Sequence, residues 1–304
     1  MITQKVVLIL GAGASRPYGF PLGYALKTRI TDDLNPHSGR KMLSDVRDVG
    51  FGAEEIEAFR SALHKSGKRS VDAFLEHRPE FLKVGKTATA CALIPCENEN
   101  ALFAANEENW YEYLFNRLNA RFDEFDKNAV SVVTFNYDRS LEQYLITALR
   151  NAYGKSLQEC AAKLRSIPIV HLYGQLGELP GLGVPAIAFG APITPEILTK
   201  SAEGIQIIHE DISGNPQFQK AHELIRTAPR ICFIGFGYDK TNLERLLGDR
   251  VVDNQRVFGS AEGFTSSECS RIEQALKTHG FRTVELDYIW GKALDFLRNH
   301  SPFD

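Results

Sequence analysis

A glycine turn near the beginning of the sequence has the composition of a phosphate-binding loop. Glycines stand at positions 11 and 13, directly after the apolar run 5–10. They let backbone N–H groups approach a phosphate, and the N-terminus of the following helix favours the anion. The alternative is a tight turn that merely joins a strand to a helix. The buried strand before the turn makes nucleotide binding the better interpretation.

The turn departs from the form that nicotinamide dehydrogenases use. Its third glycine position holds Arg16. An acidic ribose ligand is also needed about 20 residues further on, after a second strand. Asp32 and Asp33 have this spacing but follow a helix predicted at residues 22–33. The sequence therefore argues against a dehydrogenase, while Arg16 stays among the predicted cofactor-binding residues.

Asn136 and Asp138 follow the next apolar run, residues 129–135. Ligands of open α/β sheets collect at the carboxyl ends of the strands. An asparagine there can hold a water or an amide in a fixed orientation, and Asp138 can accept a hydrogen bond from an amide. Asp138 can equally cap the helix that is predicted to continue to Arg150.

His171 and Tyr173 lie where a third apolar run, residues 167–172, comes to its end. They are two positions apart and therefore share one face of an extended chain. A histidine in this place can act as a general base near neutral pH. It can also be a hydrogen-bonded residue beneath the strand end, and the sequence leaves both interpretations open.

Gly235 and Gly237 follow the apolar run 230–234. Glycines in this position permit a close approach between backbone and ligand. Asp239 is as well placed to cap a helix as to bind a ribose. Gly259, after a weaker apolar run, is a poorer candidate of the same kind.

Apolar runs separated by helical patterns must position these residues. Buried parallel strands appear as continuous runs of β-branched and leucine residues. Strands that alternate with helices predict the α/β class, with a doubly wound, mainly parallel Rossmann-like sheet. The predicted strands are residues 5–10, 129–135, 167–172, 230–234, 257–258 and 281–286.

Residues 35–128 carry no strand signal and predict an inserted helical subdomain. Apolar residues recur at three- and four-residue intervals from Trp110 to Phe125. This spacing predicts one amphipathic helix of about four turns. Residues 1–34 and 129–304 then form the Rossmann-type domain.

The composition excludes several classes of partner. The chain has 304 residues and a formal net charge of −3. Nucleic acids and anionic membranes require a large positive field, so we expect direct binding to neither. The five cysteines are irregularly spaced without a zinc pattern, so we expect reduced thiols and no metal. No stretch resembles a signal peptide or a membrane span, which predicts a cytoplasmic protein.

Taken together, the motifs resemble those of sirtuin-like domains, in the same order and at roughly the same spacing. The likeness is greatest to bacterial sirtuin-like proteins, including those that hydrolyse NAD+ during antiphage defence. Residues 70–76 also look like that branch, and 35–128 take the place of the family's small domain. The motifs that carry the resemblance are residues 11–15, 134–138, 171–174 and 235–237.

The resemblance implies an NAD+ site. Asn136 matches the family's catalytic asparagine beside the nicotinamide ribose, and Asp138 matches the acid that binds the carboxamide. The family's catalytic histidine directly precedes a glycine, where this chain has Tyr173. Tyrosine is a poor base because its unperturbed pKa is about 10, so His171 is the nearby substitute. The pyrophosphate would be held by Gly11, Ala12, Gly13 and Ser15, and the adenosine half by Gly235, Gly237 and Gly259.

We therefore expect an NAD+ glycohydrolase that releases nicotinamide and ADP-ribose as an effector of antiphage defence. Tyr173 keeps open a second hypothesis, a catalytically inert module that binds NAD+ and signals to a partner protein. Deacylation or ADP-ribosylation of proteins is a weaker third hypothesis, because the four-cysteine zinc ribbon of deacylase sirtuins is missing. An unregulated NAD+ hydrolase would poison its own cell. We therefore expect gating by homo-oligomerisation or by a separate sensor protein.

Overall fold

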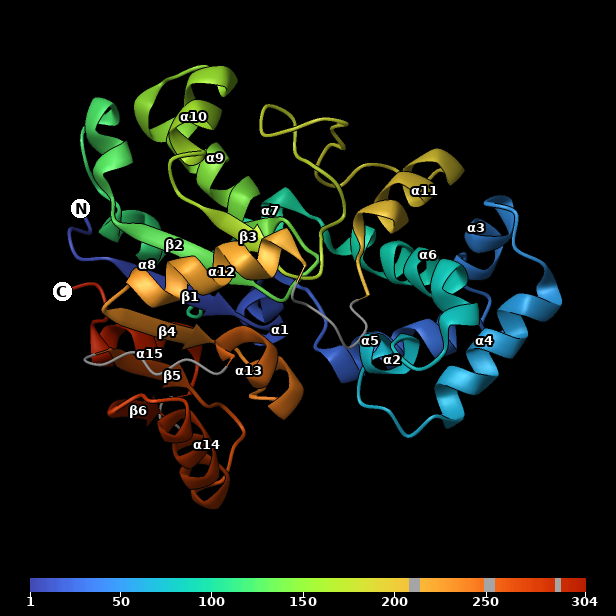
Figure 1. Ribbon diagram of the computed structural model, residues 1–304. Helices are drawn as coiled ribbons and strands as arrows, with labels where there is room; N and C mark the ends of the chain where they lie inside the picture. The colour runs from blue at the N-terminus through green and yellow to red at the C-terminus, as the bar shows by residue number, and fades with distance from the viewer. Residues whose placement is uncertain (208–213, 249–254, 288–290) are drawn as a thin grey trace.

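The computed structural model describes residues 1–207, 214–248, 255–287 and 291–304. Its centre is a six-stranded, fully parallel sheet with the strand order β3-β2-β1-β4-β5-β6 (Figure 1). This is the strand order of a doubly wound Rossmann-like fold, which confirms the predicted fold class. The strands are β1 Val6–Leu10, β2 Val130–Thr134, β3 Ile169–His171, β4 Arg230–Ile234, β5 Arg256–Ser260 and β6 Thr283–Asp287.

The central strand, β1, is buried along its whole length and pairs with β2 on one side and β4 on the other. A parallel strand inside such a sheet has apolar contacts on both faces, which explains the continuous apolar run. The register places Leu10 opposite Thr134, and Thr134 opposite His171. The carboxyl ends of β1, β2 and β3 therefore lie in one row. The residues that follow them are brought to the same edge of the sheet.

Helices flank the sheet and extend beyond its carboxyl edge (Figure 1). None of the described helices is both long and apolar enough to cross a membrane. Short 3-10 turns occupy Arg16–Tyr18, Pro79–Phe81, Ile94–Cys96 and Phe122–Lys127. The α-helices are α1 Ala12–Ser15, α2 Gly23–Asp33, α3 Met42–Asp48, α4 Ala53–Lys65, α5 Val71–Leu75, α6 Leu82–Leu93, α7 Glu99–Leu102, α8 Trp110–Arg117, α9 Ser140–Tyr153, α10 Leu157–Leu164, α11 Pro195–Gly204, α12 Pro216–Thr227, α13 Lys240–Leu247, α14 Ser266–Thr278 and α15 Ala293–His300.

A group of helices stands beyond the strand ends, on the right of Figure 1. Residues 35–128 form helices and turns without a strand. Helix α6 is the centre of this group and packs against α2, α3, α4 and α11. Because α2 precedes residue 35 and α11 follows β3 in the sequence, the group includes two helices from outside 35–128. Helix α8, by contrast, packs against α9 and α15 at the sheet.

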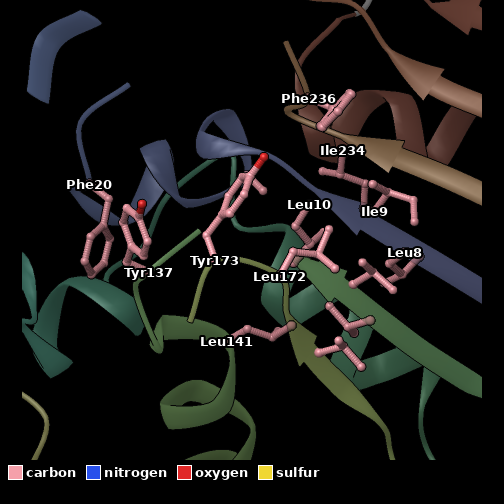
Figure 2. Packing of buried hydrophobic residues seen from close by; sticks show 14 of the residues in the cluster. Leu8, Ile9, Leu10, Phe20, Tyr137, Leu141, Leu172, Tyr173, Ile234 and Phe236 are labelled. Atoms are coloured by element: carbon pink, nitrogen blue, oxygen red, sulfur yellow. The ribbon is translucent and has the colours of Figure 1, made fainter. Parts of the chain in front are cut away.

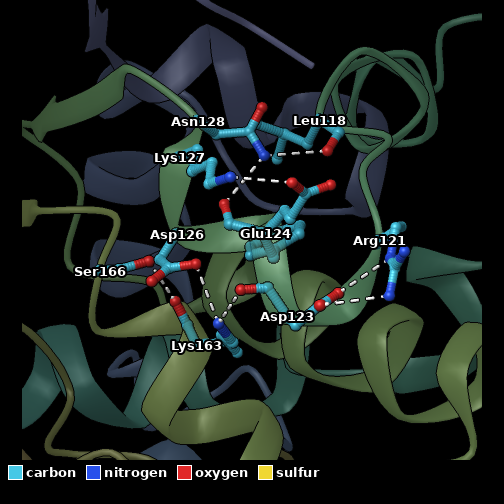
Figure 3. Close-up of polar contacts among 10 residues, drawn as sticks. Leu118, Arg121, Asp123, Glu124, Asp126, Lys127, Asn128, Lys163 and Ser166 are labelled. Atoms are coloured by element: carbon cyan, nitrogen blue, oxygen red, sulfur yellow. Dashed lines mark hydrogen bonds and ion pairs between the residues drawn. The ribbon is translucent and has the colours of Figure 1, made fainter.

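The single long helix predicted from Trp110 to Phe125 is wrong. Helix α8 has only eight residues, and a separate 3-10 helix covers Phe122–Lys127. The buried side chain of Asn128 explains the break, because its Nδ2 donates to Leu118 O and to Phe125 O, both at 3.0 Å (Figure 3). The predicted apolar positions still face the core, but the backbone carbonyls are satisfied by this amide and not by a continued helix.

Candidate functional site

Four of the predicted site residues converge where β1, β2 and β3 end. Ser15, Asn136, Asp138 and His171 line a small internal space, which we call the inner cavity. The inner cavity has a volume of about 10 Å³ and is also lined by the apolar strand residues Leu10, Val132 and Ile169. A space of this size accommodates about one water molecule. The sequence motifs are therefore brought together by the register of the strands.

Asn136 is held in a fixed orientation by its neighbours. Its side-chain Nδ2 donates to Gly11 O at 3.0 Å and to Ser15 Oγ at 3.1 Å. Its backbone N–H donates to Thr134 Oγ1 at 3.0 Å. Because both amide protons are donated within the protein, the side-chain oxygen is the atom of Asn136 that can accept a hydrogen bond from a ligand or a water.

Asp138 both lines the inner cavity and supports the start of α9. Its Oδ1 accepts a hydrogen bond from the backbone N–H of Ser140 at 3.1 Å and another from the Ser140 hydroxyl. Burial raises the pKa of this carboxyl above its ordinary value, although the hydroxyls of Ser140 and Ser15 partly oppose the shift. The N-cap of α9 is Arg139 and no side chain caps this helix, so Asp138 contacts its first residue without being the predicted cap.

Both ring nitrogens of His171 face acceptors. Nδ1 lies 2.8 Å from Asn136 O, and Nε2 lies 2.6 Å from Glu142 Oε1. Burial by itself would lower the pKa of His171, but the carboxylate of Glu142 and the two hydrogen bonds raise it above its ordinary value. Because both ring nitrogens face these acceptors, the imidazole has no free nitrogen with which to take a proton from water.

Glu142 belongs to the site, although no motif indicated it. It is the third residue of α9 and is buried against His171. The sequence offered no signal for it, because Glu142 lies within the helix and its partner His171 follows on a separate strand. Tyr111 of α8 was also missed; it lines the inner cavity, and its hydroxyl lies 2.7 Å from Ser140 Oγ.

A larger space, which we call the outer pocket, lies beside the same pair. It has a volume of about 350 Å³ and is also lined by Glu142 and His171. The outer pocket is bordered by the end of α10, the segment before β3 and residues 175–182. Its charged lining residues besides the pair are Arg139, Arg165, Glu178 and Lys220.

Tyr173 does not join the inner cavity. Its buried ring contacts those of Phe135 and Phe218, with ring centroids 5.7 Å and 6.2 Å away, and it lies within the apolar cluster of Figure 2. Its hydroxyl donates to Asn242 Oδ1 at 2.7 Å and accepts from Arg245 Nη1 at 3.1 Å. Burial raises its pKa to about 12, although Arg245 opposes this shift. Near neutral pH the hydroxyl therefore keeps its proton.

The glycine turns that follow β1 and β4 are in contact. They lie at the point where the order of the strands in the sheet reverses. Gly11 N donates to Ile234 O at 3.0 Å, and Gly13 N donates to Gly235 O at 2.9 Å. A Cβ atom on Gly11 would lie 2.6 Å from Gly235 O, and one on Gly235 would lie 2.1 Å from Ala14 N. The glycines therefore let two backbones touch, and these two N–H groups already have partners.

The remaining predicted cofactor-binding residues lie apart from the inner cavity. Ala12 is the first residue of α1. The half-exposed Arg16 pairs with Glu262 at 2.9 Å. Gly237 is exposed, and a Cβ added to it would meet nothing within 4 Å. Gly259 is covered by the ring of Tyr238, whose hydroxyl would lie 2.0 Å from an added Cβ.

Metal ligands and disulfides are not features of the described part of the chain. No group of three or more His, Cys, Asp or Glu residues within it could hold a metal ion. All five cysteines are free thiols. Asp239, the possible ribose ligand, accepts a hydrogen bond from Asn242 N at 3.2 Å and so caps α13.

A comparison of the sequence with models of known protein families and with curated proteins finds no match.

Proposed function

We propose that this protein binds NAD+ at the carboxyl edge of the sheet and hydrolyses its nicotinamide–ribose bond. The observation that carries the proposal is the convergence of Ser15, Asn136 and Asp138 beside the first glycine turn. In a Rossmann-like sheet this edge, at the point between β1 and β4, is where dinucleotides bind. The order of the four motifs along the chain, which resembles that of sirtuin-like domains, supports the same substrate.

The reaction places modest demands on the protein. The bond between C1′ and the ring nitrogen breaks with its electron pair moving to the nitrogen, so the pyridinium leaves as neutral nicotinamide. Water forms the new C–O bond at the oxocarbenium-like C1′ and releases a proton to the solvent, which gives ADP-ribose. Oriented dipoles lower this barrier most. Asn136 Oδ1 would orient the water, and Asp138 would accept from the carboxamide.

Binding of NAD+ requires a conformational change. An inner cavity of about 10 Å³ is far smaller than a nicotinamide ring. The N–H groups of Gly11 and Gly13 are also bonded to the second glycine turn. These features support a closed state of the site, and we infer that a partner protein or self-association opens it.

Nicotinamide release from NAD+ tests the proposal. Wild type, Asn136→Ala and the control Asn151→Ala, an exposed position on α9, are assayed at low and high protein concentration. We expect turnover in wild type and Asn151→Ala, and a loss of about 100-fold or more in Asn136→Ala. Binding of NAD+ without nicotinamide release at every concentration would refute hydrolysis.

A second candidate function is supported by the occupied side chains. Neither ring nitrogen of His171 is free, and the Tyr173 hydroxyl is bonded on two sides. A site without a free base suits a module that binds NAD+ and signals to a partner protein. Calorimetry that finds NAD+ binding abolished by Asn136→Ala, together with no turnover in the wild type, would favour this function.

A further inference from the structure

The pair formed by Glu142 and His171 joins α9 to the end of β3. The two side chains are buried, and the atoms Nε2 and Oε1 are 2.6 Å apart. A pair this short and this well shielded from water is strongly coupled, because charges interact more strongly where the local dielectric is low.

The other side of the imidazole is bonded to the backbone of the site. Nδ1 lies 2.8 Å from Asn136 O. A carbonyl oxygen only accepts, so Nδ1 must carry a proton. If Glu142 is ionised, Nε2 carries a proton as well and the ring is an imidazolium.

Asn136 is thus fixed from three directions. Its amide side chain reaches the first glycine turn, its N–H bonds to Thr134, and its carbonyl oxygen bonds to His171. The first two contacts belong to strand ends that the sheet aligns. The third contact, from His171 to the Asn136 carbonyl, depends on the pair formed by Glu142 and His171.

We propose that Glu142 is a positioning residue that acts through His171. The carboxylate keeps the imidazole doubly protonated, and the imidazolium holds the Asn136 carbonyl, so that the Asn136 side chain points to the first glycine turn. The expected effect on turnover rests on the proposed NAD+ hydrolysis. The expected protonation of the pair is independent of that proposal.

The pair also forms a wall between two spaces. Glu142 and His171 line both the inner cavity and the outer pocket. The outer pocket, at about 350 Å³, is large enough for a small heterocycle such as imidazole to reach the place of the His171 ring. This arrangement makes chemical rescue a feasible test.

Other titratable groups surround the pair and contribute to its environment. Asp138 adds negative charge from the start of α9, and its field raises the pKa of His171 further. Tyr111 of α8 contributes a neutral hydroxyl to the inner cavity. Arg139 is neutralised by Glu97 at 2.6 Å. The groups across the outer pocket are Arg165, Glu178 and Lys220.

Nitrogen NMR of the histidine ring tests the protonation directly. At about pH 7.5, one unit above the ordinary histidine pKa of about 6.5, we expect His171 of the wild type to be an imidazolium. In Glu142→Gln it should be neutral, while the exposed control Glu203→Gln should match the wild type. A neutral His171 in the wild-type protein would overturn the proposal.

Kinetics test the positioning role. Glu142→Gln should lower kcat on the order of 10- to 100-fold, with a smaller effect on KM, because the displaced asparagine orients the water less well. Imidazole added to His171→Gly should restore part of kcat, and it should leave wild type and Asn136→Ala unchanged. An unchanged kcat in a folded Glu142→Gln protein would contradict the role.

The two proposals fail in different ways. If wild type releases no nicotinamide but His171 is an imidazolium that Glu142→Gln neutralises, hydrolysis is refuted and the ion pair stands. If wild type hydrolyses NAD+ while His171 is neutral, hydrolysis stands and the positioning proposal is refuted.

Discussion

The Tyr173 hydroxyl is a bridge between two parts of the fold. It donates to Asn242 and accepts from Arg245, and Arg245 is in turn paired with Glu76 of the helical group at 2.8 Å. A buried polar group that loses such a partner costs about 1–3 kcal/mol. We therefore expect the Tyr173 hydroxyl to contribute to the free energy of unfolding.

Replacing Tyr173 with Phe tests this role. We expect the free energy of unfolding to fall by about 1–2 kcal/mol, because Asn242 and Arg245 lose a partner in a partly buried place. Urea unfolding measures the change, with the exposed Tyr24→Phe as the matched control. A Tyr173→Phe protein as stable as the control would contradict the bridge.

The raised pKa of His171 predicts how stability depends on pH. A folded-state pKa above the unfolded value gives stability that is complete below the unfolded pKa of about 6.5 and is lost as pH rises through the folded pKa. Burial opposes this shift, and the Glu142 carboxylate causes it. The stability advantage of wild type over Glu142→Gln should therefore shrink above about pH 6.5. Urea unfolding across this range measures it, and an advantage that is constant with pH would count against the pair.

Sequence reasoning found the residues of the site that lie in strand-end motifs and missed those that reach it from elsewhere. Asn136 and Asp138 were predictable because ligand-facing residues follow buried strands. Glu142 and Arg245 were not, because they sit on helices and their partners are fixed only when the elements pack. The dependence of Asn136 on His171 could not be predicted either. The contact is made by a backbone carbonyl, which every residue has, so the residue type does not indicate it.

At the scale of elements, the contact between the two glycine turns sets the geometry of the site. Gly235 has a φ of 57°, and a Cβ added to it would lie 2.1 Å from Ala14 N. The backbone of the turn after β4 is thus in direct contact with the backbone of the turn after β1. Their separation fixes where a pyrophosphate would have to enter.

A pair of alanine substitutions tests this contact. Gly235→Ala should lower the free energy of unfolding by roughly 2–5 kcal/mol, because it adds backbone strain and a clash. Gly237→Ala, two residues later and facing open space, should change it by less than about 0.5 kcal/mol. Thermal and urea unfolding measure both, and equal effects would show that the close approach does not matter.

The strands were predictable from the sequence because burial on both faces leaves a continuous apolar run. The helix from Trp110 was predicted at the right start but with the wrong length. Its apolar spacing continues to Phe125, yet the Asn128 amide takes the carbonyls that a longer helix would have used. A buried side chain ten residues further along the chain is outside the reach of a periodicity argument.

At the scale of the whole molecule, the helical group is tied to the strand ends by helix α5. Asp72 accepts a hydrogen bond from the Tyr137 hydroxyl, and Glu76 pairs with Arg245. Both acids lie on one face of the chain segment that includes α5, and both contacts cross the edge where NAD+ is proposed to bind. Opening of the site for the proposed binding of NAD+ would loosen these two contacts.

Weakening the contact between Glu76 and Arg245 should favour binding of NAD+. In Glu76→Gln the pair with Arg245 is weakened, so we expect NAD+ to bind more tightly than it does to the wild type, because less energy is needed to open the site. The exposed Glu80→Gln is the control. Isothermal calorimetry measures both, and weaker binding to Glu76→Gln would mean that Glu76 belongs to the ligand site itself.

Fold class was accessible from the sequence, but the composition of the helical group was not. Helix α11 packs against α6 although it follows β3 in the sequence, because apolar faces pack together irrespective of their order in the chain. Helix α2, which precedes residue 35, packs against α4 and α6 in the same way, so the order of segments in the sequence does not show which helices make up the group.

The central place of β1 has a consequence for how the protein is made. Val6 lies opposite Val130 on one side and Arg230 on the other. The ribosome delivers β1 before either neighbour, and β4 follows only after β2 and β3 have been synthesised. Contacts so distant in sequence are slow to form. A nascent chain that has not yet reached β4 presents an apolar strand with one unpaired edge, the kind of surface that chaperones protect from aggregation.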